Sequence, residues 1–449
     1  MNRRIAVIGS GISGLVSAYC LKNGLNAEFQ RDPDIPLFDV TLFESDSRLG
    51  GHTATIDVEL EGEQFAIDTG FIVYNDWTYP NFIRLMEQLK VRSQPTAMSF
   101  SVHCERTGLE YAGSNYNTLF AQRRNLFRPA YLRMLTDIVR FNKESLADVE
   151  AGELPETMSL GEYLDSRGYS EYFIDKYLVP MGAAIWSSGI DDMRKFPLIF
   201  FVKFFKNHGL LSIKDRPQWR TLIGGSKTYI EPLSASFRDS IRLNSNIVSI
   251  DRHDGDIHIR LSGGEILHFD AVVIATHSDQ ALNLLEQPTR TEREILSAIP
   301  YQDNDVVLHT DTTLLPQRKL AWSSWNYRIK QVQGSDVAQL TYSMNILQNL
   351  QSRHNFCVSL NQTEAINPDK ILGEYVYAHP VFTVEGIAAQ QRWQEIAGSR
   401  NTWFCGAYWR NGFHEDGVFS GVRAAQSIQQ RFATEGHEEL SDTSAVASA

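Results

Sequence analysis

The sequence is poor in cysteine and lacks the cysteine spacings typical of disulfide frameworks and zinc sites. Its four cysteines are dispersed along 449 residues, at Cys20, Cys104, Cys357 and Cys405. There is no CxxC pair and no HExxH motif. We therefore expect reduced thiols in a cytoplasmic protein and predict no metal site. His253 and His258, in a segment of alternating residues, are interpreted as surface residues.

The sequence also lacks a long apolar run and an excess of positive charge. Its strongest apolar concentration, residues 196–205, is interrupted by Lys203 and falls short of the about 20 residues needed to cross a bilayer. Residues 1–4 lead directly into an apolar run, so we expect no signal peptide. Asp plus Glu number 54 against 42 for Lys plus Arg, a net charge of −12, which argues against nucleic-acid binding.

The first fifty residues have the order strand, glycine turn, helix, strand, acid. The apolar residues 5–8 precede Gly9, Gly11 and Gly14 of a GxGxxG motif, and a second apolar run ends at Glu44. Such glycines permit a sharp turn, close approach of a pyrophosphate and tight packing of a helix on a sheet. The carboxylate can bind ribose hydroxyls and repels a 2′-phosphate, which favours FAD over NADP. The motif therefore predicts a dinucleotide-binding site, and the alternative is a plain glycine turn in an α/β core.

Hydrophobic periodicity predicts an α/β fold built from interleaved segments. Residues 271–275 are typical of a buried parallel strand, and residues 81–89, 129–142 and 159–164 have helical spacing. We predict a Rossmann-like domain interleaved with a substrate domain of helices and a mixed or antiparallel sheet. The first comprises residues 1–80, 215–300 and 395–432; the second comprises a helical part, 81–214, and a sheet part, 301–394. The acidic residues 433–449 are predicted to be a disordered tail.

Several motifs in combination resemble the flavin amine oxidase superfamily. They are the glycine turn, Glu44, residues 48–51, residues 68–70, Gly224-Gly225, residues 271–275, Gly406 and residues 415–417. Residues 70–75, 322–327 and 412–417 are most similar to the bacterial predicted NAD/FAD-binding proteins and to the flavin domain of plant cyclopropane fatty acid synthases. The resemblance implies an amine-oxidase-like fold and noncovalent FAD, because no cysteine occupies an evident attachment position.

The resemblance also implies which residues contact FAD. Arg48 would lie beside the pyrophosphate, Val248 would bind the adenine through its main chain, and the helix after Gly417 would point at the flavin. The implied contacts are Gly9, Gly11, Ile12, Ser13, Gly14, Glu44, Ser45, Arg48, Gly50, Gly51, His52, Gly70, Phe71, Val248, Ala275, Thr276, Gly406, His414, Gly417 and Val418. Candidates for proton transfer are His414, Glu415 and His277, each with a structural role as the alternative.

Two positions depart from the superfamily pattern. Ala407 follows Gly406 where an acidic residue often holds the ribityl chain, so that contact is not expected here. Phe413 occupies the place of a tyrosine in the aromatic cage of monoamine oxidases, which makes an amine substrate less favoured.

The substrate is predicted from an apolar, basic insertion. Phe200, Phe204, Trp325 and Phe413 are its candidate contacts. Arginines and apolar residues alternate over residues 123–140, which indicates either contact with anionic lipid headgroups or a core helix with a solvated basic face.

The leading hypothesis is an FAD-dependent oxidase or desaturase that removes a hydride from an unsaturated or modified fatty acyl chain, free or in phospholipid, with O2 as the electron acceptor. Peripheral contact with the inner face of the membrane is expected. The alternatives are an amine oxidase, and a flavoprotein without net oxidation that acts as an isomerase or as an accessory module for a lipid methyltransferase.

Overall fold

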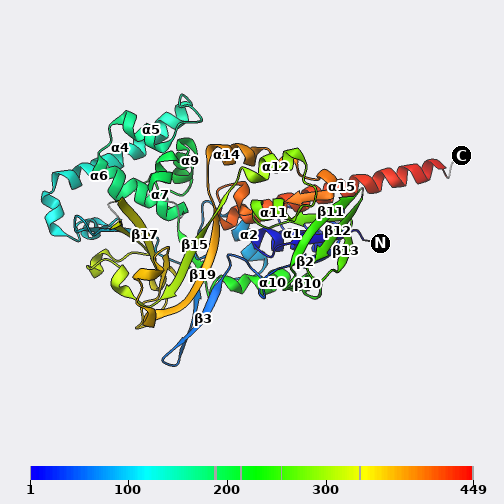
Figure 1. Ribbon diagram of the computed structural model, residues 1–449, viewed down its shortest axis with the longest axis horizontal. Helices are drawn as coiled ribbons and strands as arrows, with labels where there is room; N and C mark the ends of the chain where they lie inside the picture. The colour runs from blue at the N-terminus through cyan, green and yellow to red at the C-terminus, as the bar shows by residue number, and fades with distance from the viewer. Residues whose placement is uncertain (1, 187–189, 213–214, 254, 333–334, 447–449) are drawn as a thin grey trace.

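A five-stranded parallel sheet forms one centre of the molecule (Figure 1). The computed structural model describes residues 2–186, 190–212, 215–253, 255–332 and 335–446. The strand order is β10-β2-β1-β14-β20, and every neighbouring pair is parallel. These strands are β1 (Arg4–Ile8), β2 (Asp39–Phe43), β10 (Ile241–Arg242), β14 (Ala271–Ile274) and β20 (Thr402–Phe404). All four residues of β14 are buried, as expected for an apolar strand covered on both faces.

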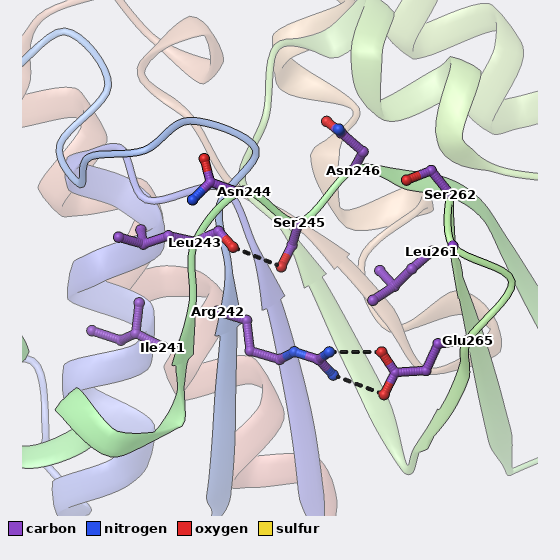
Figure 2. A pocket seen from close by; sticks show the side chains of 10 residues that line it. Ile241, Arg242, Leu243, Asn244, Ser245, Asn246, Leu261, Ser262 and Glu265 are labelled. Atoms are coloured by element: carbon purple, nitrogen blue, oxygen red, sulfur yellow. Dashed lines mark hydrogen bonds and ion pairs between the residues drawn. The ribbon is translucent and has the colours of Figure 1, made fainter.

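A three-stranded antiparallel sheet lies beside this sheet and consists of β11 (Ile247–His253), β12 (Asp256–Leu261) and β13 (Ile266–Phe269). A polar pocket of about 480 Å³ opens between residues 243–246 and the turn that joins β12 to β13 (Figure 2). Arg242 and Glu265, which both line the pocket, form a bidentate ion pair with N–O distances of 2.6 and 3.3 Å. Its lining includes none of the residues predicted to contact FAD.

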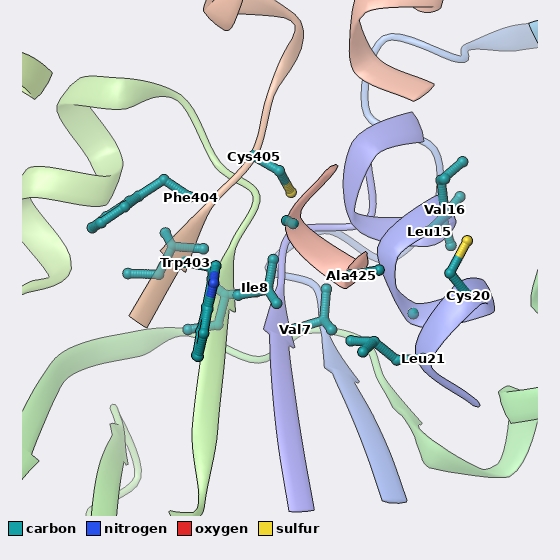
Figure 3. Packing of buried hydrophobic residues seen from close by; sticks show 14 of the residues in the cluster. Val7, Ile8, Leu15, Val16, Cys20, Leu21, Trp403, Phe404, Cys405 and Ala425 are labelled. Atoms are coloured by element: carbon teal, nitrogen blue, oxygen red, sulfur yellow. The ribbon is translucent and has the colours of Figure 1, made fainter. Parts of the chain in front are cut away.

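Helices from both ends of the chain pack on the parallel sheet. Val7 and Ile8 of β1 lie among Leu15 and Val16 of α1 (Ile12–Asn23) and Ala425 of α15 (His414–Val446) in one buried cluster (Figure 3). The other helices around this part of the fold are α2 (Pro80–Gln88), α10 (Ile230–Ser234), α11 (Ser278–Leu284), α12 (Arg290–Ser297) and α14 (Val384–Gln391). The first and last segments of the sequence therefore share one core.

A seven-stranded sheet forms the second centre, with the order β19-β15-β18-β17-β16-β7-β8. Its strands are β7 (Phe100–Cys104), β8 (Leu109–Ala112), β15 (Tyr301–His309), β16 (Trp325–Val332), β17 (Ser335–Ser343), β18 (Cys357–Leu360) and β19 (Ile371–Pro380). Only the β16–β7 pair is parallel. Residues 81–214 were predicted to be helical, and the strands β6 (Ser93–Pro95), β7 and β8 within them correct that prediction. In strands this short, the alternation of apolar and polar residues is too brief to distinguish a strand from a loop. Only the pairing with neighbouring strands identifies them.

Two smaller sheets connect the centres. The hairpin β3 (Thr55–Leu60) and β4 (Glu63–Asp68) is followed by β5 (Tyr74–Asn75), which pairs with β9 (Trp219–Leu222), and β9 also pairs with β6. Asp68 fixes the arrangement, because its carboxylate accepts hydrogen bonds from the Ser226 N–H at 2.8 Å and from Gln348 Nε2 at 3.1 Å. Gln348 follows the short helix α13 (Met344–Leu347) of the second centre.

The remaining helices gather at the end of the molecule opposite the free end of α15 (Figure 1). Helix α4 begins with a proline and ends at the left-handed Gly152, and α5 begins with a capping box formed by Ser159 and Glu162. The helices are α3 (Tyr116–Leu119), α4 (Pro129–Ala151), α5 (Leu160–Arg167), α6 (Glu171–Phe173), α7 (Val179–Trp186), α8 (Ile190–Lys195) and α9 (Leu198–Asn207).

The C-terminal segment differs from the prediction. We predicted a disordered tail from residue 433, whereas α15 continues to Val446 and its last turns project from the body (Figure 1). Residues 447–449 lie outside the described part of the chain. Among the described residues, no helix combines the length and apolar character needed to cross a membrane.

Candidate functional site

The predicted cofactor residues converge on the carboxyl edge of the parallel sheet. The last residues of its strands are level, since Ile8 pairs with both Phe43 and Ile274, and Ile274 pairs with Phe404. The segments that follow these strands are the glycine turn, Glu44 and Ser45, Ala275 and Thr276, and Gly406. Ligands of open parallel sheets bind at this edge.

The glycine turn leaves open space at the start of α1. Gly9 has a φ of +98°, and a Cβ atom there would lie 2.9 Å from the Ala275 carbonyl oxygen. A Cβ on Gly14 would collide with the Gly9 carbonyl, whereas a Cβ on Gly11 would meet no protein atom within 4 Å. No side chain caps the helix, so the N–H groups of Ile12 and Ser13 begin it beside an open space. This arrangement is suited to an anion such as pyrophosphate.

Glu44 fixes the turn from the neighbouring strand. Its carboxylate accepts hydrogen bonds from Ser10 N at 2.9 Å, Ser10 Oγ at 2.5 Å and Asp46 N at 2.9 Å. Ser45 Oγ donates at 3.2 Å to Oε1, the oxygen that also accepts from Asp46 N, whereas both Ser10 groups donate to Oε2. Glu44 therefore positions the glycine turn as well as offering charge to a ribose.

A second glycine loop lies against the first. Gly50 N donates to Ser10 O at 3.1 Å, and Gly50 and Gly51 have φ values of +114° and +55°. A Cβ on Gly51 would lie 3.4 Å from the Gly11 Cα. The Arg48 guanidinium donates to Gly51 O at 2.9 Å and so holds this loop in shape while staying partly exposed.

The start of α15 packs against the start of α1. A Cβ on Gly417 would collide with Ile12, and a Cβ on Gly421 would collide with the Ser13 carbonyl. Gly406 N donates to Ser420 Oγ at 3.0 Å, which fixes the end of β20 to the same helix. Two helix N-termini, with their positive dipole ends, are thereby held side by side.

His414 lies in the first turn of α15. Its Nε2 is 3.0 Å from Thr53 Oγ1 and 3.2 Å from Tyr229 OH, and its ring stacks on Phe71 at 3.6 Å with an interplanar angle of 11°. Burial lowers the pKa of His414 to about 3, so the imidazole is neutral at neutral pH. His414 is therefore placed to orient neighbouring groups rather than to carry charge.

Glu415, predicted as a candidate proton carrier, is hydrogen-bonded at the start of another helix. Its carboxylate accepts from Phe82 N at 2.9 Å and from Asn81 Nδ2 at 2.6 Å, which caps α2. Burial raises its pKa above the usual value. These contacts fit the structural alternative, since they account for the carboxylate by helix capping, and the catalytic role stays a prediction.

His277 belongs to a group of rings that the sequence did not connect. His52 lies 6.1 Å from His277 and 5.4 Å from both Tyr377 and His379, while His277 stacks on Tyr301 at 4.1 Å. Burial lowers the pKa of His277, and it lowers the pKa of His379 to about 4. The histidines of this group are therefore neutral at neutral pH.

The predicted substrate residues form part of an aromatic wall, which we define as Phe413, Phe204, Trp186, Phe200 and Phe382. Phe413 stacks on Phe204 with ring centroids 5.1 Å apart, Trp186 lies 4.7 Å from Phe204, and Phe200 stacks on Phe382 at 5.3 Å. Phe413 packs against both hydrophobic cores of the molecule.

Two predicted residues lie away from these groups. Trp325 packs on the same core as the aromatic wall, but its ring contact is with Tyr342 at 5.3 Å. Val248 lies at an irregularity of β11, where the pairing shifts between Ile247 and Ser249, and it is exposed. A residue at such a bulge has main-chain groups outside the ladder, which suits the predicted adenine contact.

Sequence reasoning missed Thr53, Tyr229 and His379. Thr53 and Tyr229 meet His414 only through the fold, because they come from a glycine loop and a short 3-10 helix 176 residues apart. No local pattern in the sequence indicates these contacts.

Comparison with known proteins identifies the family. Residues 12–343 match the model of the family described as flavin containing amine oxidoreductase. The chain belongs to this family. A search of curated protein sequences found no significant match.

Solved structures share the fold at low sequence identity. Cyclohexylamine oxidase from Brevibacterium oxydans is 14% identical, with 96% of this chain and 100% of that chain covered and a TM-score of 0.65. A proposed protoporphyrinogen oxidase from Exiguobacterium sp. is 19% identical, with 96% and 99% covered and a TM-score of 0.67. A fatty acid isomerase from P. acnes that produces CLA is 15% identical, with 94% and 98% covered and a TM-score of 0.62.

The protein is an FAD-dependent oxidoreductase of this family, and its site fits the cofactor. A pyrophosphate fits the open space beside Gly11 at the uncapped start of α1. The Glu44 carboxylate suits a ribose. The predicted α/β fold and the predicted cofactor are both confirmed.

Gly11→Ala tests the cofactor site. The new methyl group meets no protein atom, so we expect normal folding but at least about a tenfold loss of FAD affinity, equivalent to about 1.4 kcal/mol. Flavin content and FAD titration of the apoprotein measure the effect. Gly263→Ala is the matched control, because its Cβ also enters open space without unfavourable φ. Equal FAD affinity in both variants would contradict the assignment.

Proposed function

We propose that this oxidoreductase removes a hydride from an unsaturated or modified fatty acyl chain. The observation that carries the proposal is the aromatic wall, which extends from Phe413, the residue before His414, to Phe382. Phe204 is 4% exposed within it. Aromatic faces offer a large apolar contact area, which suits an acyl chain.

The chain's own residues would orient the substrate and keep the reaction site dry. The glycine turn, Glu44 and the start of α1 would hold FAD, which would supply the acceptor for a hydride and a proton lost from adjacent substrate carbons, with O2 reduced to H2O2 by the two electrons and two protons. Phe413 and Phe204 would align the acyl chain. The positive ends of the α1 and α15 dipoles would stabilise negative charge at this site. Because His414 is neutral, it would add no positive charge of its own there.

FAD binding is proposed to be noncovalent. All four cysteines are buried, and burial raises the pKa of Cys405, the cysteine beside Gly406, to about 12. A thiol with this pKa is a poor nucleophile toward a flavin.

Isomerisation of a fatty acid is a second candidate. The solved fatty acid isomerase shares the fold, and an isomerase would use the same hydride removal followed by its return at another carbon. An amine substrate is less favoured, because Phe413 offers a phenyl ring in place of the cage tyrosine.

The acyl chain is proposed to come from a membrane surface. Residues 116–132, which we call the corner, expose four large apolar side chains: Tyr116, Leu126, Phe127 and Leu132 have exposed fractions of 84, 44, 86 and 40%. Arg123, Arg124 and Arg128 lie in the same segment, which includes the 3-10 helix η1 (Arg123–Phe127). Apolar side chains among arginines on a protein of net charge −12 suit an anionic bilayer.

The rest of this segment, in α4, is amphipathic and turns one face to the core. Tyr131, Met134 and Phe141 of α4 are buried, and Arg133 and Arg140 lie near the buried Asp137. The docking surface therefore consists of the corner, which ends in the first turn of α4, rather than the whole of residues 123–140.

Phe127→Glu tests membrane docking. We expect the substitution to abolish cosedimentation with vesicles containing phosphatidylglycerol, because it places a carboxylate where the ring would enter the interface. Val376→Glu is the control, since Val376 is also exposed but lies on β19. Wild-type binding should weaken with salt. Equal effects of the two substitutions, or no wild-type binding, would rule out this surface.

Anaerobic mixing with extracted membrane lipids tests the reaction. We expect flavin bleaching together with a lipid product two hydrogens lighter. A product of unchanged mass with a displaced double bond would favour the isomerase, and bleaching by simple amines alone would refute the acyl proposal. Phe413→Gln should slow bleaching about tenfold or more by placing an amide in the aromatic wall, whereas Phe413→Leu should keep most of the rate.

A further inference from the structure

The solvent face of the β11–β13 sheet carries five side chains with metal-binding atoms. In the antiparallel register Asp251 lies opposite His258, His253 opposite Asp256, and His258 opposite His268. The other face of the sheet is buried: Ile250, Ile257, Ile259 and Phe269 lie in the core, and Arg252 forms an ion pair with Glu292. The alternation along three strands thus places the five polar residues on one surface.

Asp256 is the residue that joins two of the imidazoles. Its carboxylate is 2.8 Å from His258 Nε2 and 3.1 Å from His268 Nδ1. The rings of His258 and His268 are 4.3 Å apart at an angle of 63°. One donor atom from each of the three residues lies within 4.8 Å of the other two.

We propose that Asp256, His258 and His268 bind a divalent transition metal ion, with Zn²⁺ the ion that the donors suit best. Two imidazoles and one carboxylate are a ligand set of zinc and its neighbours, whereas Mg²⁺ and Ca²⁺ prefer oxygen donors. Water would complete the coordination, since His268 and Asp256 are 48 and 44% exposed.

The distances are close to those that a bound ion needs. Ligands at about 2.0–2.1 Å from a tetrahedral zinc ion are about 3.3–3.4 Å apart. The N–O distances of 2.8 and 3.1 Å would therefore open by only a few tenths of an ångström. The ion would lie where each imidazole now hydrogen-bonds to the carboxylate, with the coordinating nitrogens unprotonated.

A second set of donors overlaps the first through His258. Asp251 and His253 are 2.9 Å apart, and with His258 they also lie within 4.8 Å of one another. In this set the carboxylate approaches only one imidazole, and His253 is 55% exposed. The structure therefore assigns the ion to Asp256, His258 and His268, where it would cross-link β12 to β13.

Titration of the FAD-loaded protein with ZnCl2 tests this assignment. The protein is first treated with a chelator and dialysed, and calorimetry then measures stoichiometry and affinity. We expect one Zn²⁺ per chain and a rise in Tm. His258→Gln and His268→Gln should each weaken binding about tenfold or more, while His253→Gln should bind Zn²⁺ with an affinity close to that of wild type. MgCl2 should give no binding.

Three results would overturn the proposal. They are absence of Zn²⁺ binding to the wild-type chain, binding that His258→Gln leaves unchanged, and loss of binding in His253→Gln but not in His268→Gln. Because these residues are on the surface, their substitution should leave flavin content unchanged. That control separates loss of a ligand from loss of the fold.

Discussion

The structure depends on the close contact between the starts of α1 and α15. Gly417 and Gly421 permit it, because a side chain at either position would collide with Ile12 or Ser13. The two helices come from opposite ends of the sequence, and β1 and β20, which precede them, lie in the same parallel sheet. The helix dipoles and free N–H groups of both helices then act at one edge of one sheet.

Around this contact the chain forms two different environments, one polar and one aromatic. Glycines, Glu44 and the uncapped start of α1 form a polar region suited to pyrophosphate and ribose. His414 is held by hydrogen bonds to Thr53 and Tyr229. On the other side of His414, the surroundings are apolar and consist of the aromatic wall. Phe413 is the residue at which the two environments meet, since it packs against both cores. The buried histidines have lowered pKa values and add no charge to this boundary at neutral pH.

The sequence predicts the features that depend on local patterns. The apolar run of residues 271–275 and the GxGxxG motif indicate a parallel strand and a glycine turn because neighbouring residues determine both. Features that depend on distant partners could not be predicted. β7 and β8 are short strands recognisable only beside β16, Glu415 caps a helix more than 300 residues earlier in the chain, and Asp256 and His258 meet His268 only across two strands.

We expect FAD to bind across the joined starts of α1 and α15. A crystal structure of the FAD complex tests this most directly. The pyrophosphate should lie within hydrogen-bonding distance of the main-chain N–H groups that begin α1, in the space beside Gly11, with the flavin toward the start of α15. A pyrophosphate bound elsewhere, such as in the pocket beside Arg242 and Glu265, would contradict it.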